Sequence, residues 1–174
     1  MANKKPLKIF IVAGEESGDL HGSKLVHAMK KHNTNIQFTG HGGDRMANEK
    51  VQIIEHIDNL AIIGFIEVIR HLPYMFKVMG TTVNWLRDNI PDRLILIDYP
   101  GFNLRLAREA FQLGIPITYF ILPQVWAWKE ERVSILRDNV DQCLSIIPFE
   151  QEWFENKDVK TNFIGHPFIE LEPP

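Results

Sequence analysis

Cysteine is almost absent from this sequence, since Cys143 is the only one among 174 residues. A single cysteine cannot form a disulfide within the chain or a zinc site built from several thiolates, so we expect a reducing compartment. Cys143 lies in an apolar stretch, which favours a small buried side chain over a nucleophile. The seven histidines lack the H-E-x-x-H or paired spacing of metal ligands. We therefore expect no metal and no other cofactor.

Long hydrophobic runs and blocks of basic residues are also missing. No stretch reaches the roughly 18 consecutive apolar residues of a membrane span, and the apolar run at 9–13 is too short for a secretion signal. The 19 Lys and Arg residues are outnumbered by 22 Asp and Glu residues, which gives a net charge of −3. We expect a protein that is soluble or attached to a membrane surface and that does not bind nucleic acid.

The residues that are present form short apolar runs separated by amphipathic segments. This alternation predicts an α/β fold in which helices cover both faces of a Rossmann-like parallel sheet. We expect strands at 7–13, 35–39, 93–97, 115–120, 142–146 and 162–164, and helices at 20–31 and 103–113. The length fits one domain over 1–174, and the Pro-Pro end is typical of a connection to a second domain.

The loop at 13–19, AGEESGD, follows the first predicted strand. In open α/β sheets, ligands bind beyond the carboxyl ends of the strands, so this loop is a candidate site. Its glycines lack the spacing of a nucleotide loop, and carboxylates would repel a pyrophosphate. The carboxylates of Glu15 and Glu16 suit the hydroxyls of a sugar or polyol better. Alternatively, the loop only begins a helix, with Ser17 or Asp19 as its cap.

The loops at 40–46 and 97–103 follow two further strands. The first of them, GHGGDRM, is glycine-rich and is more typical of a simple turn than of a site. The second, IDYPGFN, places Asp98 where a buried strand emerges. Partial desolvation there raises the pKa of a carboxyl group, so Asp98 is the best candidate for a general base. Alternatively, Asp98 caps the helix that starts near Asn103, and capping is also the role we expect for Asn103.

The loop at 122–129, LPQVWAWK, contains two tryptophans. Large rings in a loop favour a binding wall formed by Trp126 and Trp128, although one of the two fits a place in the core equally well. Arg132 follows one helical turn later. Its guanidinium either holds a phosphate or faces solvent.

The segment at 64–79 has more apolar residues than one buried helix face needs, with Arg70, His71 and Lys77 among them. An exposed apolar face in such a helix binds a membrane surface. The residues expected on that face are Ile66, Ile69, Leu72, Met75 and Phe76. The alternative is a helix buried against the sheet.

Taken in order along the chain, the motifs resemble the amino-terminal half of the bacterial lipid-A-disaccharide synthase family. They are AGEESGD at 13–19, GHGGDRM at 40–46, LAIIGFIEV at 60–68, IDYPGFN at 97–103, PQVWAWKEER at 123–132, PFE at 148–150 and FIGHP at 163–167. The family is similar to GT-B glycosyltransferases, which have two Rossmann-like domains facing a cleft. The resemblance implies that this chain is the acceptor-side domain and that a carboxy-terminal domain, which binds the donor nucleotide, is missing.

The activity implied by the resemblance is inverting transfer of diacylglucosamine from UDP-diacylglucosamine to diacylglucosamine-1-phosphate, with release of UDP. The reaction takes place on the cytoplasmic face of the inner membrane and needs neither a metal nor a covalent intermediate. The resemblance assigns Asp98 as the base. It assigns the substrate cleft to Glu15, Glu16, Ser17, Asn103, Trp126, Trp128 and Arg132.

The sequence departs from the family pattern at His41 and Asp44, and at Leu122 and Gln124 beside Pro123. The alternative function is a non-catalytic sugar- or nucleotide-binding α/β module.

Overall fold

The computed structural model describes residues 5–60, 65–127 and 130–166, and for 65–71 it describes the backbone but not the side chains. The strands form one seven-stranded sheet in the order β3-β2-β1-β4-β5-β6-β7, and each neighbouring pair is parallel. The strands are β1 Leu7–Val12, β2 Ile36–Gly42, β3 Gln52–His56, β4 Arg93–Ile97, β5 Ile117–Phe120, β6 Gln142–Ser145 and β7 Thr161–Phe163. The predicted Rossmann-like α/β fold is therefore confirmed.

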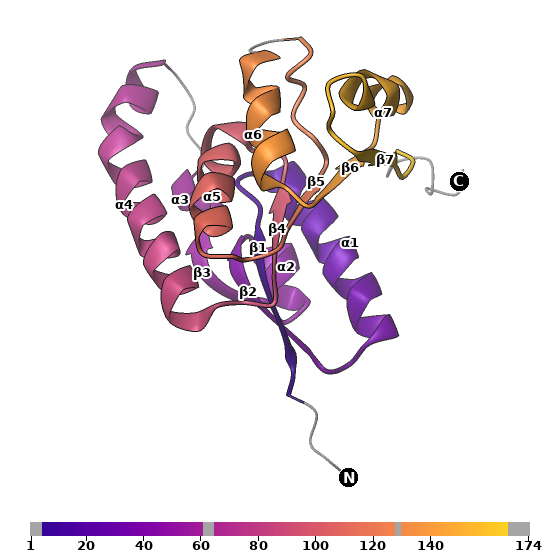
Figure 1. Ribbon diagram of the computed structural model, residues 1–174. Helices are drawn as coiled ribbons and strands as arrows, with labels where there is room; N and C mark the ends of the chain where they lie inside the picture. The colour runs from indigo at the N-terminus through magenta and orange to yellow at the C-terminus, as the bar shows by residue number, and fades with distance from the viewer. Residues whose placement is uncertain (1–4, 61–64, 128–129, 167–174) are drawn as a thin grey trace, which may run out of the picture.

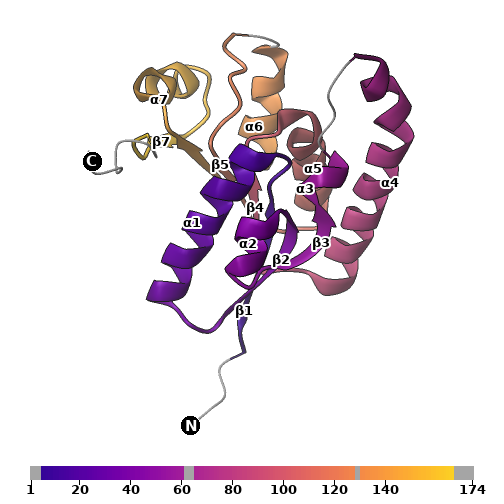
Figure 2. The same cartoon turned by 180° about the vertical axis from the view of Figure 1, so that it is seen from behind.

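Helices cover both faces of this sheet (Figures 1 and 2). The helices are α1 Glu16–His32, α2 Asp44–Asn48, α3 Ile57–Leu60, α4 Phe65–Asn89, α5 Pro100–Gln112, α6 Val133–Asn139 and α7 Pro148–Glu155, with a 3₁₀ turn, η1, at Glu130–Arg132. Helices α4, α5 and α6 lie on one face, whereas α1 and α2 lie on the other. No helix in the described ranges combines the length and hydropathy that crossing a bilayer requires.

The core is divided by the sheet into two layers, because successive side chains of a strand point to opposite faces. In β1, Phe10 faces the layer beneath α4, α5 and α6, whereas Ile11 faces the layer beneath α1 and α2. Between β1 and β2 the backbones approach so closely that a Cβ at Gly40 would lie 1.8 Å from the Ile11 carbonyl oxygen. Cys143 is buried within β6, as the sequence predicts.

Several predicted boundaries are wrong. Strand β3 was not predicted, because QIIEH is short and contains only two apolar residues. Helix α1 begins at Glu16, so neither Ser17 nor Asp19 caps it; Glu15 occupies the N-cap position. The segment Gly40 to Gly42 belongs to β2 and is not a turn.

Helix α5 also begins earlier than expected, at Pro100, and Tyr99 is its N-cap residue. The expectation that Asn103 caps this helix is therefore wrong. Asn103 lies within the first turns of α5 and is fully buried. Asp98 does not occupy the N-cap position of α5 either, because it precedes Tyr99.

Candidate active site at the strand ends

The order of the sheet determines where a ligand site can form. From β1 the chain builds β2 and β3 on one side and then returns to add β4 on the other side. The carboxyl ends of β1 and β4 therefore flank the point at which the topology reverses, where α/β sheets bind their ligands. The loops at 13–19 and 97–103 leave the sheet at this point.

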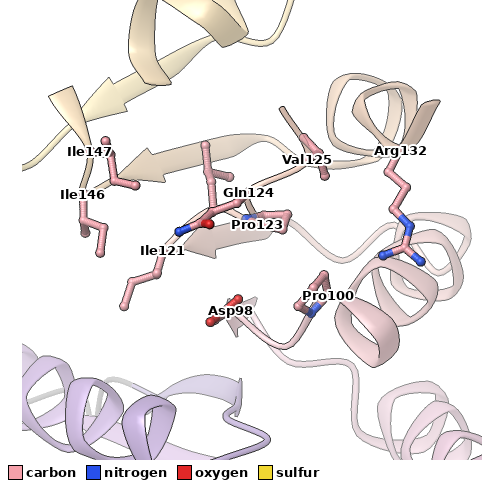
Figure 3. A pocket seen from close by; sticks show the side chains of 10 residues that line it. Asp98, Pro100, Ile121, Pro123, Gln124, Val125, Arg132, Ile146 and Ile147 are labelled. Atoms are coloured by element: carbon pink, nitrogen blue, oxygen red, sulfur yellow. The ribbon is translucent and has the colours of Figure 1, made fainter. Parts of the chain in front are cut away.

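A cavity of about 600 Å³ opens beside the end of β4 (Figure 3). We call it the strand-end cavity. Its lining comes from the turn after β4, the loop after β5, the segment after β6 and Arg132. The lining residues are Asp98, Pro100, Ile121, Leu122, Pro123, Gln124, Val125, Arg132, Ile146 and Ile147. The volume is in the range of small-molecule sites in proteins.

Asp98 stands on a strained turn. Its φ angle is 43° and that of Tyr99 is 48°, so two successive non-glycine residues adopt the left-handed conformation. Each such residue costs on the order of 1–3 kcal/mol and persists only where its surroundings hold it.

Side chains from two different elements hold this turn. The Tyr119 hydroxyl donates a hydrogen bond of 2.7 Å to the Asp98 carbonyl oxygen. The Asn103 amide nitrogen donates to the same oxygen at 2.8 Å and to the Ile97 carbonyl oxygen at 3.1 Å. The backbone of Asp98 is therefore fixed by β5 and α5 together, and its carboxylate is left to line the cavity.

The environment of the Asp98 carboxyl group raises its pKa to about 6. Burial is the largest cause, and the negative charge of Glu15 is the next. Glu150 adds a smaller effect in the same direction, whereas the hydrogen bond from the Tyr99 backbone lowers the pKa. A carboxylate with this pKa is ionised at neutral pH and is a stronger base than an ordinary aspartate.

Glu15, Glu16 and Ser17 are exposed and line a neighbouring hollow of about 360 Å³ together with Ile57 and Asp58. The Ser17 hydroxyl donates a hydrogen bond of 2.6 Å to Glu15. The structure thus brings the first loop next to Asp98, but these three side chains do not line the strand-end cavity itself.

Asp19, from the same loop, has a structural role. Its buried carboxylate accepts hydrogen bonds from the backbone N–H groups of Gly43, Arg45 and Met46, at 2.7, 3.0 and 3.1 Å. It therefore links the start of α1 to the start of α2. His41 is buried beside Thr82, with 2.9 Å between its Nε2 and the Thr82 hydroxyl oxygen. Burial lowers the pKa of His41 to about 4.

Trp126 is fixed by a buried polar network. Its indole N–H donates a hydrogen bond of 2.9 Å to Glu150, and the Ser145 hydroxyl donates to the other oxygen of Glu150 at 2.6 Å. The ring also packs edge-on against Phe149, with 5.0 Å between the centroids. Trp126 is half-buried beside the loop that lines the strand-end cavity, whereas Trp128 lies outside the described residues.

Three more residues noted in the sequence line the strand-end cavity. Arg132 lines the strand-end cavity and, among the described lining side chains, supplies its positive charge. In Figure 3, Arg132 and Asp98 lie on opposite sides of Pro100. Leu122 is buried and Gln124 is exposed, and both line the cavity. Among the described residues, no group of three acidic, histidine or cysteine side chains gathers to hold a metal ion.

Tyr119, Ser145 and Glu150 were not singled out from the sequence. Each is buried. Tyr119 bonds to Asp98 and Glu150 to Trp126, and Ser145 bonds to Glu150. For Tyr119 and Ser145 the available signal was a polar group within an apolar strand, whereas Glu150 lies in α7. Glu150 is part of the PFE motif, but the motif did not indicate what the residue does.

Residues 9–174 match the family model of lipid-A-disaccharide synthetase. The chain belongs to this family. The lipid-A-disaccharide synthase of Nitrosococcus oceani is 42% identical over 167 residues, which are 96% of this chain and 43% of that protein. The enzyme of Trichlorobacter lovleyi is 39% identical over 171 residues, which are 98% of this chain and 45% of that protein. The chain thus spans less than half the length of these relatives.

Membership of the lipid-A-disaccharide synthetase family confirms the resemblance drawn from the motifs. Among solved structures, a UDP-GlcNAc 2-epimerase from Neisseria meningitidis bound to UDP-GlcNAc has the same fold, with a TM-score of 0.66. The alignment covers 94% of this chain and 47% of the epimerase at 12% identity. At this identity the similarity establishes the fold alone.

Proposed function

We propose that this lipid-A-disaccharide synthetase family member is the acceptor-side domain of an inverting glycosyltransferase. The proposed reaction transfers diacylglucosamine from UDP-diacylglucosamine to diacylglucosamine-1-phosphate and releases UDP. The observation that carries the proposal is the Asp98 carboxylate, which is held on a strained turn at the switch point of the sheet and has its pKa raised to about 6. Such a group is suited to removing a proton from a sugar hydroxyl.

In the proposed mechanism, Asp98 takes the proton of the acceptor hydroxyl while the hydroxyl oxygen attacks the anomeric carbon of the donor. The new carbon–oxygen bond forms on the face opposite the bond to UDP, which breaks, and the configuration inverts. Asn103 is buried, and its side-chain amide nitrogen donates hydrogen bonds to two backbone carbonyl oxygens. These bonds support a role in positioning Asp98. Arg132 provides a positive charge for a phosphate of the donor in the same cavity.

The remaining site residues are proposed to bind sugar. Glu15, Glu16 and Ser17 offer acceptors and a hydroxyl to the hydroxyl groups of a glucosamine ring. Trp126, with Trp128 as its sequence neighbour, is proposed to form the wall against which a ring packs. A second domain is proposed to bind the uridine diphosphate, since this chain spans less than half of its relatives.

The proposal is tested by comparing this 174-residue chain with a longer protein in which the carboxy-terminal half of the Nitrosococcus oceani relative follows it. We expect the longer protein to form the disaccharide and release UDP, and the chain alone to form none, because donor and acceptor must be held together for attack. Both products are measured by chromatography. Turnover by the chain alone contradicts the division into halves. Binding of both substrates by the longer protein without any product favours a non-catalytic binding module.

Attachment to a membrane surface through α4 is a second part of the proposal, at the cytoplasmic face of the inner membrane. Leu72 and Phe76 are 43% and 61% exposed, which supports an apolar surface on this helix. Met75, which was predicted on the same surface, is half-buried and not exposed, because it packs against the core. Ile66 and Ile69, which were predicted on the same face, lie outside the described side chains.

Replacing Leu72 and Phe76 together by serine is expected to weaken vesicle binding at least about tenfold, since burying a large apolar side chain contributes roughly 1.5–3 kcal/mol. Binding is measured by sedimentation with vesicles of phosphatidylethanolamine and phosphatidylglycerol. Phe111→Ser is the matched control, because Phe111 is 55% exposed on α5. It should leave vesicle binding unchanged. Equal weakening by the control contradicts attachment through α4, and so does a large drop in Tm of the double variant.

A further inference from the structure

A second cavity, of about 260 Å³, lies between α4 and α5 and has no part in the mechanism above. We call it the α4–α5 cavity. Helix α4 contributes Leu72, Met75, Phe76 and Met79, and α5 contributes Phe102 and Arg105. We propose that this cavity binds one acyl chain of a phosphorylated lipid, whose phosphate pairs with Arg105. The inference rests on the proposed function, because it assigns a place to one chain of the proposed acceptor.

The lining fits an acyl chain in polarity and in size. Its side chains from α4 are all apolar, and Arg105 is the charged residue among the described residues that line it. If a methylene takes about the volume of a water molecule in the liquid, ~30 Å³, the cavity holds roughly eight of them. Burying such a chain removes apolar surface from water and is favourable.

Arg105 gives the cavity a preference for an anionic lipid. Its guanidinium lies over the ring of Phe76, 5.8 Å from the centroid, and the side chain is exposed. The charge therefore stands at the opening of an apolar cavity. A guanidinium pairs with a phosphate through charge-assisted, often bidentate, hydrogen bonds.

The α4–α5 cavity also adjoins the strand-end cavity along a single turn of backbone. Asp98 and Pro100 line the strand-end cavity, whereas Tyr99 and Gly101 line the α4–α5 cavity. The Tyr99 hydroxyl contacts the sulfur of Met75 on α4, at 3.8 Å. A lipid with its sugar beside Asp98 therefore needs to cross only this turn to place an acyl chain between the helices.

The binding test uses the 174-residue chain with its methionine methyl groups labelled for NMR, and n-decyl phosphate below its micelle concentration as the probe. We expect the signals of Met75 and Met79 to shift. Met29 and Met46 belong to the layer on the opposite face of the sheet, and their signals should not move. Shifts of all these methionines together, or of none, overturn the proposal.

Two further probes separate the chain from the phosphate. Decanol should shift the same two signals but bind at least tenfold more weakly than decyl phosphate, and inorganic phosphate alone should shift neither. Arg105→Gln should remove the preference for decyl phosphate while leaving decanol binding unchanged. An unchanged preference in this variant overturns the role of Arg105. Shifts caused by inorganic phosphate alone overturn the acyl chain as the ligand.

A pair of glycine variants tests whether the cavity itself is filled. Gly101 lines the cavity and Gly80 does not, yet a Cβ at either would meet no atom within 4 Å. Gly101→Leu should therefore fold with a Tm at or above that of the parent and lose at least tenfold in decyl phosphate affinity. Gly80→Leu, which adds the same side chain to α4, should bind normally. Undiminished binding by Gly101→Leu overturns the proposal.

The two experiments separate the lipid site from the proposed sugar transfer. If the longer protein transfers sugar but Met75 and Met79 do not respond to decyl phosphate, the acyl site is wrong and the transferase stands. If these methionines respond as expected but the longer protein forms no disaccharide, the lipid site is supported and the proposed reaction is wrong.

Discussion

Asp98→Asn in the longer protein is expected to lower kcat at least about 100-fold, because general base catalysis contributes roughly 10²–10⁴. The amide cannot take a proton from the acceptor, yet it has the shape of the carboxyl group and can still accept the hydrogen bond from the Tyr99 backbone. The parent protein should lose activity as the pH falls through about 6, where Asp98 becomes protonated. A variant with a nearly normal kcat contradicts the role of Asp98 as the base.

The stability of the same variant is an independent control on the 174-residue chain. The pKa of Asp98 is raised in the folded state from 3.8 to about 6, so between these values the folded protein binds more protons than the unfolded one. The free energy of unfolding of the parent therefore falls as the pH rises through this interval, and the loss is complete above it. Asparagine has no such dependence. Asp98→Asn should be more stable than the parent by about 1–3 kcal/mol at pH 8, and the difference should vanish below about pH 3.

Gly14→Ala is expected to reduce transfer by a comparable factor without touching Asp98 directly. A Cβ at Gly14 would lie 2.2 Å from two carbon atoms of the Tyr99 ring, so the ring must move. Tyr99 follows Asp98 in the strained turn, and a displacement of about 1 Å in a reacting group can cost on the order of 100-fold in rate. The overpacking itself should lower the free energy of unfolding by about 1–3 kcal/mol.

A double-mutant cycle identifies the cause of that loss. If the added methyl group acts by displacing the Tyr99 ring, Gly14→Ala combined with Tyr99→Ala should be no worse in kcat than Tyr99→Ala alone. Gly80→Ala is the matched control, because nothing lies within 4 Å of the position its Cβ would take. Fully additive losses in the cycle contradict a mechanism through Tyr99.

The parts of the fold that could be predicted from the sequence are those encoded by local patterns. After Arg93, strand β4 is buried on both faces and its sequence is a continuous apolar run, and the bounds of the strand were predicted correctly. Edge strand β3 contacts one neighbour and has an exposed or half-buried side chain at every position, which leaves little apolar signal. The start of α1 was missed because Glu16, Ser17 and Gly18 carry no helical periodicity.

The candidate site was predictable only in part, for a different physical reason. The position of Asp98 follows from its strand, but the groups that hold it come from elsewhere in the chain. Tyr119 reaches its carbonyl oxygen across 21 positions of sequence, and Trp126 is separated from Glu150 by 24. Such pairings arise from the packing of the sheet. Asn103 differs from these pairs, because it bonds to Ile97 only six positions away; its role was missed because α5 begins at Pro100 and places Asn103 inside the helix.

The Asp19 link between α1 and α2 has a consequence for the order in which the chain gains structure during synthesis. Strands β1 and β2, both helices and all three hydrogen bonds of Asp19 lie within the first 48 residues. All the residues of this unit are synthesised before α4, so its internal contacts need no later part of the chain. The Asp98 turn must wait for Asn103 and Tyr119. All the residues of the Asp19 link are therefore synthesised well before Asn103 and Tyr119, which hold the Asp98 turn.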